Sequence, residues 1–133
     1  MRFVLDASVT INWAMRDESS PNADIAFSAL RSGAAVAPAI WWYEVRNTLV
    51  VNERRMRITP EDSNQFLIDL LRLEIVVDDD PARSAVLDLS RRLSRSVYDA
   101  AYLELALRKQ LPLATLDKSL AAAAITVGVE LLQ

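Results

Sequence analysis

The chain has 133 residues, of which 52% are hydrophobic and 25% charged, and its formal net charge is −3. This length suits one domain with a full hydrophobic core, and charged residues interrupt every apolar run before it reaches the length of a membrane span. The chain contains no cysteine and no histidine. This excludes disulfides, thiolate and imidazole metal sites, and catalysis by either side chain.

Strand-like and helical segments alternate along the chain. Short continuous apolar runs predict strands at 2–5, 34–37, 74–77 and 113–116, each buried on both faces, with a weaker candidate at 129–132. Helical spacing of apolar residues predicts helices at 9–16, 23–31, 40–55, 60–73, 82–93, 97–109 and 119–127. This alternation predicts an α/β fold: a single domain over residues 1–133, with a mostly parallel sheet covered by helices on both faces.

Two helices carry recognisable start signals. Thr59 precedes Pro60, and Asp80 precedes Pro81, so each pair places a capping side chain before a proline in the first helical turn. The acidic run 78–80 is therefore interpreted as capping the helix that begins at Pro81, in preference to a metal role. Only two glycines are present, so glycine-rich phosphate-binding loops are excluded.

The N-terminus leads directly into a strand and an acid, without the apolar stretch and cleavage site of a signal peptide. We therefore expect a cytoplasmic protein that has no membrane segment. The net charge argues weakly against a strong, nonspecific nucleic-acid binder. Because histidine and cysteine are absent, any metal must be held by oxygen atoms, which favours Mg²⁺ or Mn²⁺.

Four carboxylates stand beside apolar segments, where an ionised group is costly. Asp6 follows the first predicted strand and Asp117 the fourth, while Glu44 and Asp99 lie in apolar helical segments. An ionised carboxylate beside a core costs several kcal/mol unless a positive charge offsets it. One shared cation would offset all four, and ligands of parallel sheets bind at the carboxyl ends of strands. The sequence therefore predicts a metal site, and with it hydrolysis of a phosphodiester.

Three of these acids have a structural alternative at a helix start. The side chains of Asp6 and Asp117 could each cap the helix that follows. Asp99 could complete a capping box with Ser96. Ser8 could cap the first helix or present its hydroxyl to the site.

Glu44 is harder to explain structurally. Its helical neighbours are mostly apolar, the nearby Arg46 points to another side, and Asn47 and Thr48 add polar atoms to the same face. This pattern suits a hydrated site better than a dry core. The alternative is a glutamate that reaches solvent from the edge of a buried helix.

The chain resembles a PIN domain, and specifically a VapC-type toxin ribonuclease, in segments 4–8, 37–38, 41–49, 96–106 and 111–117. Tyr98-Asp99-Ala100-Ala101-Tyr102 is the most specific piece. The resemblance implies a three-layer α/β/α PIN-like fold and RNA cleavage at an acidic Mg²⁺ or Mn²⁺ centre. Its acidic residues would be Asp6, Glu44, Asp99 and Asp117, with Ser8, Asn47 and Thr115 as polar supports. We expect Asp6 and Asp99 to bind the metal directly, and Glu44 and Asp117 to act partly through water.

The resemblance also implies partners: an RNA substrate, a second copy of the chain in a homodimer, and a cognate VapB-type antitoxin that lays a peptide across the site. Trp13, Trp41 and Trp42 are candidates for that groove or for the dimer face, with at least one expected in the core. Two arginine clusters, at 54–57 and 91–95, are interpreted as solvated helix ends, with phosphate contacts as the alternative.

Other functions fit the sequence less well. A phosphatase using Asp6 as nucleophile usually needs an acid two residues later, where Ser8 stands. A phosphoacceptor like a response regulator would need an acidic pair near the first strand and a phosphorylated aspartate in mid-chain. This chain matches that pattern poorly. A PIN-like module that only binds a partner stays open, with the acids serving as caps. Metal binding without RNA cleavage would identify such a module.

Overall fold

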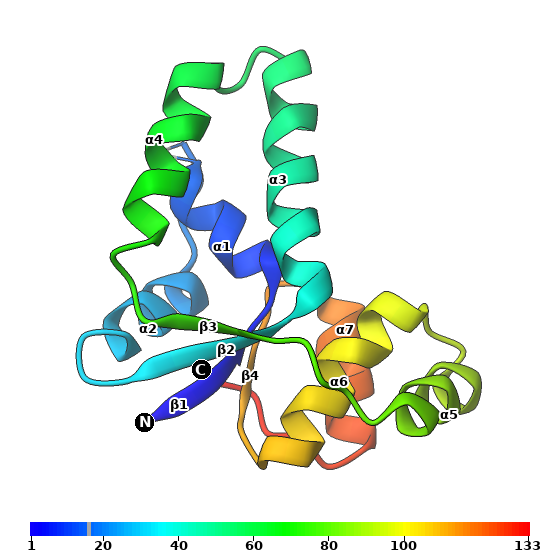
Figure 1. Ribbon diagram of the computed structural model, residues 1–133. Coiled ribbons are helices and arrows are strands. Elements are labelled where there is room, and N and C mark those ends of the chain that lie inside the picture. The colour runs from blue at the N-terminus through cyan, green and yellow to red at the C-terminus, as the bar shows by residue number, and fades with distance from the viewer. Residues whose placement is uncertain (16) are drawn as a thin grey trace.

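Four short apolar segments form the central sheet of the computed structural model, which describes residues 1–15 and 17–133 (Figure 1). They are β1 (Arg2–Leu5), β2 (Ala34–Pro38), β3 (Ile75–Asp78) and β4 (Leu113–Ala114). All neighbouring strands pair in parallel, in the order β3-β2-β1-β4. The weaker strand predicted at 129–132 is reduced to one parallel bridge, between Leu131 and Leu113.

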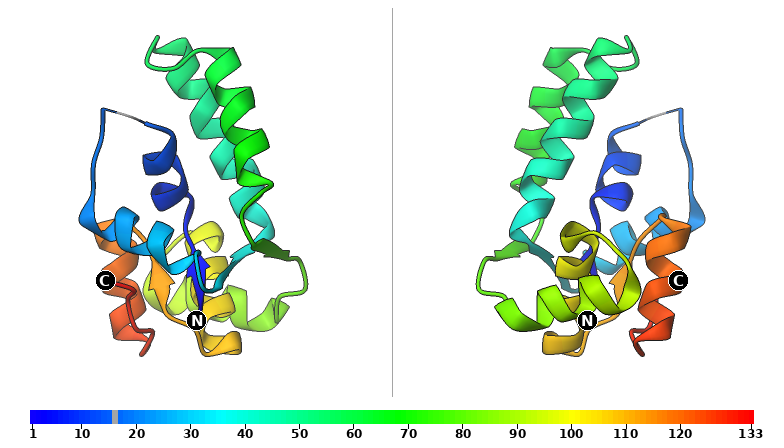
Figure 2. Two further views of the ribbon diagram at one scale, coloured as in Figure 1. Left: turned by 90° about the vertical axis from the view of Figure 1, so that its left-hand side faces the viewer. Right: turned by 90° about the vertical axis from the view of Figure 1, so that its right-hand side faces the viewer.

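Helices cover both faces of this sheet, so the predicted three-layer α/β/α architecture is confirmed. One group comprises α1 (Ala7–Ala14), α2 (Pro21–Ala29), α3 (Ala39–Arg54) and α4 (Pro60–Leu70). The other comprises α5 (Arg83–Leu93), α6 (Val97–Lys109) and α7 (Lys118–Thr126). The connections from β1 to β2 and from β2 to β3 cross the sheet in one direction and contain the first group of helices. The connection from β3 to β4 crosses in the opposite direction and contains α5 and α6. Because such crossovers are right-handed, the two groups lie on opposite faces of the sheet. Figure 2 shows α3 and α4 projecting from the sheet as an antiparallel pair.

The core lies where β1 meets α6. Residues 3–5 of β1 are fully buried, and α6 packs against β1 and β2 through a middle section in which residues 100 and 102–106 are buried. The prediction of burial on both faces is wrong for β3, where Val76 is 55% exposed. The reason is position: β3 is the last strand in the sheet order, and the helices cover the central strands.

The helix-start predictions have opposite outcomes. Thr59 caps α4 as predicted, because its hydroxyl accepts a hydrogen bond from the amide of Asp62 at 3.1 Å. The start at Pro81 is wrong: α5 begins at Arg83, after an N-cap, Ala82, that offers no side-chain oxygen.

The acidic run before α5 has a different partner from the one predicted. The Asp78 carboxylate accepts hydrogen bonds from the Arg108 guanidinium of α6 at 3.0 and 3.2 Å. This ion pair lowers the pKa of Asp78 and joins the end of β3 to α6.

Helix α1 also differs from its prediction. It begins two residues earlier than expected and ends at Ala14, while Arg16, the predicted last residue, lies outside the described residues. Within 1–15 and 17–133, no helix combines the length and the apolar character that a membrane crossing requires.

Candidate active site

The four candidate acids belong to the end of the sheet where the strands finish. The chain leaves β1 into α1 on one face and leaves β4 toward α7 on the other, so the neighbouring ends of β1 and β4 form the switch point at which parallel sheets bind ligands. Asp6 follows β1 directly, and Asp117 is the N-cap of α7 just after β4. Glu44 is in α3 and Asp99 is in the first turn of α6.

Asp6 is a buried carboxylate held by two hydroxyl groups. It is 6% exposed, and its Oδ2 accepts hydrogen bonds from Ser8 Oγ at 2.6 Å and Thr115 Oγ1 at 2.7 Å. Burial raises the pKa of Asp6; the two hydroxyl hydrogen bonds oppose that rise, and the charge of Asp117 adds to it. Although Asp6 is the N-cap residue of α1, its side chain makes no capping hydrogen bond. The capping alternative is therefore wrong for this residue.

Ser8 and Thr115 join the ends of β1 and β4 around this carboxylate. Ser8 Oγ accepts a hydrogen bond from the Leu116 amide at 2.9 Å, and Thr115 Oγ1 accepts one from the Asp117 amide at 3.0 Å. Both hydroxyls are thus fixed by backbone amides while they donate to Asp6. The result is a carboxylate whose orientation is set before any ligand arrives.

Glu44 is oriented by a tyrosine that the sequence reasoning did not assign to the site. The Tyr102 hydroxyl donates to Glu44 Oε1 at 2.6 Å and accepts from the Ala7 amide at 3.3 Å, which links α6, α3 and the start of α1. Burial raises the pKa of Glu44 against the opposing effect of this hydrogen bond, and the charges of Asp6 and Asp99 raise it further. Glu44 therefore shares one electrostatic environment with both aspartates.

Asp99 is only partly explained by helix capping. Its amide donates to Ser96 Oγ at 3.0 Å, which is the first half of a capping box. Its carboxylate does not complete the box, because Oδ2 accepts a hydrogen bond from Arg95 Nη2 at 2.5 Å. Arg95 therefore faces the acids, and the interpretation of its cluster as a solvated helix end is wrong for this residue.

Asp117 is a true helix cap. Its Oδ1 accepts hydrogen bonds from the Ser119 amide and hydroxyl, both at 2.9 Å, and from the Leu120 amide at 3.2 Å. Partial burial acts to raise the pKa of Asp117, but these hydrogen bonds and the charge of Arg95 outweigh it, so the pKa is lowered. The second carboxylate oxygen, Oδ2, makes no hydrogen bond within the described part of the chain.

The donor chemistry of this cluster fits a hard cation. Asp6 and Glu44 offer oxygen ligands, repel each other, and have no cationic side chain paired with them in the described ranges. Mg²⁺ and Mn²⁺ take such ligands and would offset that repulsion. No three acidic side chains in residues 1–15 and 17–133 already converge closely enough to hold one ion. Binding would therefore require side-chain movement or bridging water.

The other predicted supports differ in their placement. Asn47 is exposed on α3 and makes no hydrogen bond to these acids in the part of the chain that is described. Two site neighbours, Tyr102 and Arg95, were missed. Tyr102 had a usable signal, because it follows Asp99 by three positions in α6, and residues at that spacing share a helical face. Arg95 lies before the N-cap of α6, outside the helix, so helical spacing did not indicate its contact with Asp99.

The three tryptophans have different environments. Trp41 is buried and donates through Nε1 to Thr10 Oγ1 at 2.9 Å, so the expectation of at least one core tryptophan is confirmed. Trp13 is half-buried. Trp42 is 44% exposed, and the Arg46 guanidinium lies 3.6 Å from its ring centroid.

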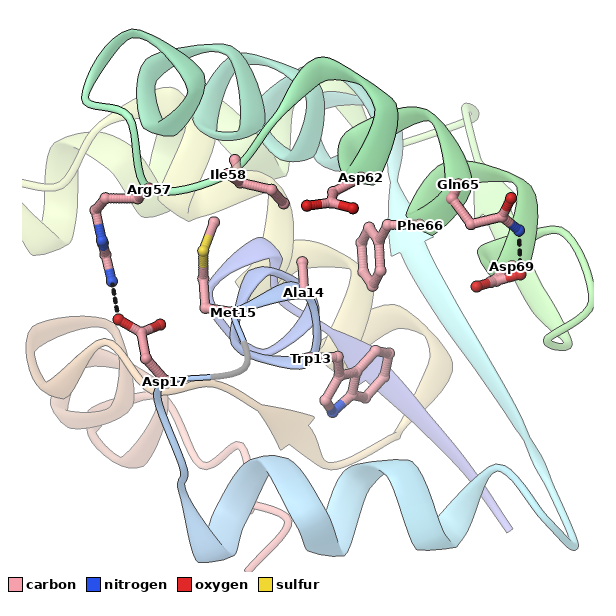
Figure 3. Close-up of a pocket in the computed structure, with 10 residues that line it drawn as sticks. All are labelled: Trp13, Ala14, Met15, Asp17, Arg57, Ile58, Asp62, Gln65, Phe66 and Asp69. Carbon is pink, nitrogen blue, oxygen red and sulfur yellow. Dashed lines mark hydrogen bonds and ion pairs between the residues drawn. The ribbon is translucent and has the colours of Figure 1, made fainter.

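A separate cavity of about 510 Å³ lies between the end of α1 and α4 with the loop that precedes it (Figure 3). Its walls combine apolar and acidic side chains, namely Trp13, Ala14, Met15, Ile58 and Phe66 with Asp17, Asp62 and Asp69, together with Arg57 and Gln65. None of the four candidate acids lines it. This cavity is thus distinct from the carboxylate cluster.

The chain belongs to the PIN domain family, whose model matches residues 3–125. This confirms the family expected from the sequence segments. Solved structures share the fold. PAE2754 from Pyrobaculum aerophilum is 24% identical, with a TM-score of 0.70 over 96% of this chain and 95% of that one.

Two further structures are more distant. FitAcB from Neisseria gonorrhoeae is 17% identical, with a TM-score of 0.65 over 100% of this chain and 97% of that one. VapC20 from Mycobacterium tuberculosis, described as a Sarcin-Ricin loop cleaving toxin, is 16% identical, with a TM-score of 0.58 over 91% and 94% of the two chains. Comparison with curated proteins finds no match.

Proposed function

We propose that this PIN domain is a metal-dependent endoribonuclease, a VapC-type toxin that hydrolyses RNA phosphodiester bonds in the cytoplasm. The observation that carries the proposal is the buried Asp6 carboxylate, oriented by two hydroxyls beside Glu44 with no protein cation paired to either in the described ranges. Such a pair is unfavourable in an empty protein and favourable around a bound cation. The site residues would be Asp6, Glu44, Asp99 and Asp117.

Mg²⁺ or Mn²⁺ would be held directly by Asp6 and Asp99, with Glu44 and Asp117 acting partly through water. When bound, such an ion lowers the pKa of its water and offsets negative charge on the phosphate. Ser8 and Thr115 would keep Asp6 in its ligating orientation.

Glu44 is suited to handle the proton of the attacking water. Its raised pKa brings it closer to neutral pH, where a carboxylate is a more effective proton acceptor. Tyr102 occupies Oε1, so Oε2 is the oxygen available to orient the water and accept its proton.

Exposed aromatic side chains support RNA as the substrate. Trp42 and Tyr43 lie in the first two turns of α3, directly before Glu44 in the sequence, and Tyr98 precedes Asp99 in α6; all three are at least 44% exposed. Bases of single-stranded RNA stack on such rings, and the Arg46 guanidinium over Trp42 adds positive charge to the same surface. This surface offsets in part the net negative charge of the chain, which disfavours RNA binding.

The proposed partners are a cognate VapB-type antitoxin and a second copy of the chain. The cavity in Figure 3 has apolar walls, including Trp13 and Phe66, and an acidic border, which suits a peptide with apolar and basic side chains. Val76 on the edge strand β3 and Leu71 just after α4, which is 83% exposed, are candidates for a homodimer face.

The test is cleavage of total cellular RNA by the purified, antitoxin-free protein in Mn²⁺, in Mg²⁺ and in chelator. Asp6→Asn and Asp99→Asn are compared with Asp88→Asn, which changes an exposed aspartate of α5. Discrete, metal-dependent cleavage by the wild type and Asp88→Asn, but not by the two site variants, is expected. Metal binding without cleavage of any RNA would favour a non-catalytic interaction module, and cleavage that survives both site substitutions would refute the site.

A further inference from the structure

Arg95 joins two of the candidate acids through one nitrogen atom. Its Nη2 donates to Asp99 Oδ2 at 2.5 Å and to Ser119 Oγ at 2.9 Å. The Ser119 hydroxyl in turn donates to Asp117 Oδ1 at 2.9 Å. One guanidinium therefore connects the start of α6 to the start of α7, across the end of the sheet where the acids gather.

This contact differs from an ordinary surface ion pair. The side chains of Arg95 and Asp99 are only 23% and 24% exposed, and Arg95 Nε is buried without a hydrogen-bond partner. Leaving a buried donor unpaired is unfavourable, so the contacts of Nη2 must hold the guanidinium in this position. Arg91 and Arg92 of the same cluster are exposed and form no ion pair in the described part of the chain.

The acids divide into two groups by their positive partners. Asp99 and, through Ser119, Asp117 are linked to a protein cation, whereas Asp6 and Glu44 accept hydrogen bonds from hydroxyl groups and pair with no cationic side chain in the described residues. A divalent ion that binds Asp99 must either displace the guanidinium from Oδ2 or approach a positive charge that is already there. Displacing the guanidinium costs its contact with Oδ2, and approaching it brings two positive charges close together. Both outcomes therefore weaken metal binding.

We propose that Arg95 is the resident cation of the metal-free site, and that it competes with a divalent metal ion for Asp99. This inference rests on the proposed function only in taking Asp99 as a metal ligand. Arg95 then stabilises the empty site against repulsion among its acids and sets the metal concentration at which the site fills. It is a positioning residue that acts through Asp99.

The test measures Mn²⁺ binding by titration calorimetry at neutral pH for the wild type, Arg95→Gln, Arg95→Lys and the matched control Arg91→Gln. Arg95→Gln is expected to bind Mn²⁺ about tenfold more tightly than the wild type, because both the repulsion and the competition are removed. Arg95→Lys keeps the charge with a shorter reach and should fall between the two. Arg91→Gln should match the wild type.

Thermal melting supplies a second readout. Without metal, Arg95→Gln should melt below the wild type, since Asp99 loses its only cationic partner in the described residues. With saturating Mn²⁺ the difference should shrink, because the ion replaces the lost charge. Should Arg95→Gln fail to fold, the order of Arg95→Lys and wild-type affinities decides the question.

Equal or weaker Mn²⁺ binding by Arg95→Gln, or by Arg95→Lys where that variant must stand in, overturns the competition while leaving the proposed nuclease intact. Absence of Mn²⁺ binding in the wild type and in every variant overturns both ideas. The two failures are thus distinguishable in one set of titrations.

Discussion

Replacing Asp6 with asparagine tests whether its carboxylate serves metal binding or stabilises the folded protein. Asparagine has nearly the same shape, and its single oxygen can still accept the hydrogen bonds from Ser8 and Thr115. It cannot be ionised, so it removes both the burial penalty and the repulsion that involves Glu44 and Asp117. If the carboxylate exists for metal binding, the metal-free protein should become more stable when it is lost.

The magnitude follows from opposing contributions. Burying an ionised carboxylate costs several kcal/mol after relaxation. Two hydroxyl hydrogen bonds offset roughly 1.5–3 kcal/mol each when the acceptor is charged, and about 1 kcal/mol each when it is neutral. The substitution therefore loses about 2 kcal/mol of hydrogen bonding and removes a larger penalty, for a net gain of about 1–3 kcal/mol. For a domain of this size, that raises the melting temperature by about 4–11 °C.

The assay is thermal melting at pH 8, where carboxylates are most fully ionised, first in chelator and then across a Mn²⁺ series. In chelator Asp6→Asn should melt above the wild type, and it should lose the Mn²⁺-dependent rise. Asp88→Asn, which changes an exposed side chain, should follow the wild type within about 0.5 kcal/mol. A fall in the melting temperature of Asp6→Asn in chelator would refute the reasoning, because it would make the carboxylate a net stabilising group.

Three further predictions concern the same structure. Tyr102→Phe should lower the free energy of unfolding by about 2 kcal/mol in urea titrations, because Glu44 Oε1 loses its donor and a buried amide loses its acceptor. In chelator, the melting temperature should rise as the pH falls from 8 toward 5. The pKa values of Asp6 and Glu44 are raised in the folded state, so the stability linked to their protonation is present at low pH and is lost as the pH rises through those values. Arg108→Ala should cost about 3 kcal/mol in guanidinium titrations, because it leaves the Glu104 carboxylate, which is 3% exposed, without its cation.

Each of these predictions has a control and a contradicting result. Tyr98→Phe alters an exposed tyrosine and should leave stability within about 0.5 kcal/mol of the wild type; an equal loss in both variants would show that the Glu44 contact is unimportant. Asp6→Asn should reduce the pH dependence without abolishing it, because Glu44 keeps its raised pKa, and a wild-type melting temperature that falls steadily from pH 8 to pH 5 contradicts the raised pKa values. Lys109→Ala removes only a 3.9 Å contact with Asp78, so a cost equal to that of Arg108→Ala would contradict the role of the buried pair.

Much of the fold could be predicted because its signals are local. Residues 2–5 form β1 and residues 97–109 form α6, as their apolar patterns indicated, and Thr59 caps α4 through a contact three residues away. The burial predicted for β3 failed because β3 lies at the edge of the sheet, and the prediction for the acidic run failed because a distant charge pairs with it. Asp78 pairs with Arg108, which is 30 positions later, and α5 begins without the acidic cap that the sequence offered.

The sequence by itself determined that any metal in this protein is held by oxygen, and that acids follow the first and fourth strands. Both conclusions depend only on composition and on neighbours within a few residues. The tertiary structure alone decided which of those acids is buried and what surrounds each one. Thr115 reaches Asp6 across 109 positions, and Tyr102 reaches Glu44 across 58. Burial and pKa depend on which elements pack together, and that packing is set by the order of strands in the sheet.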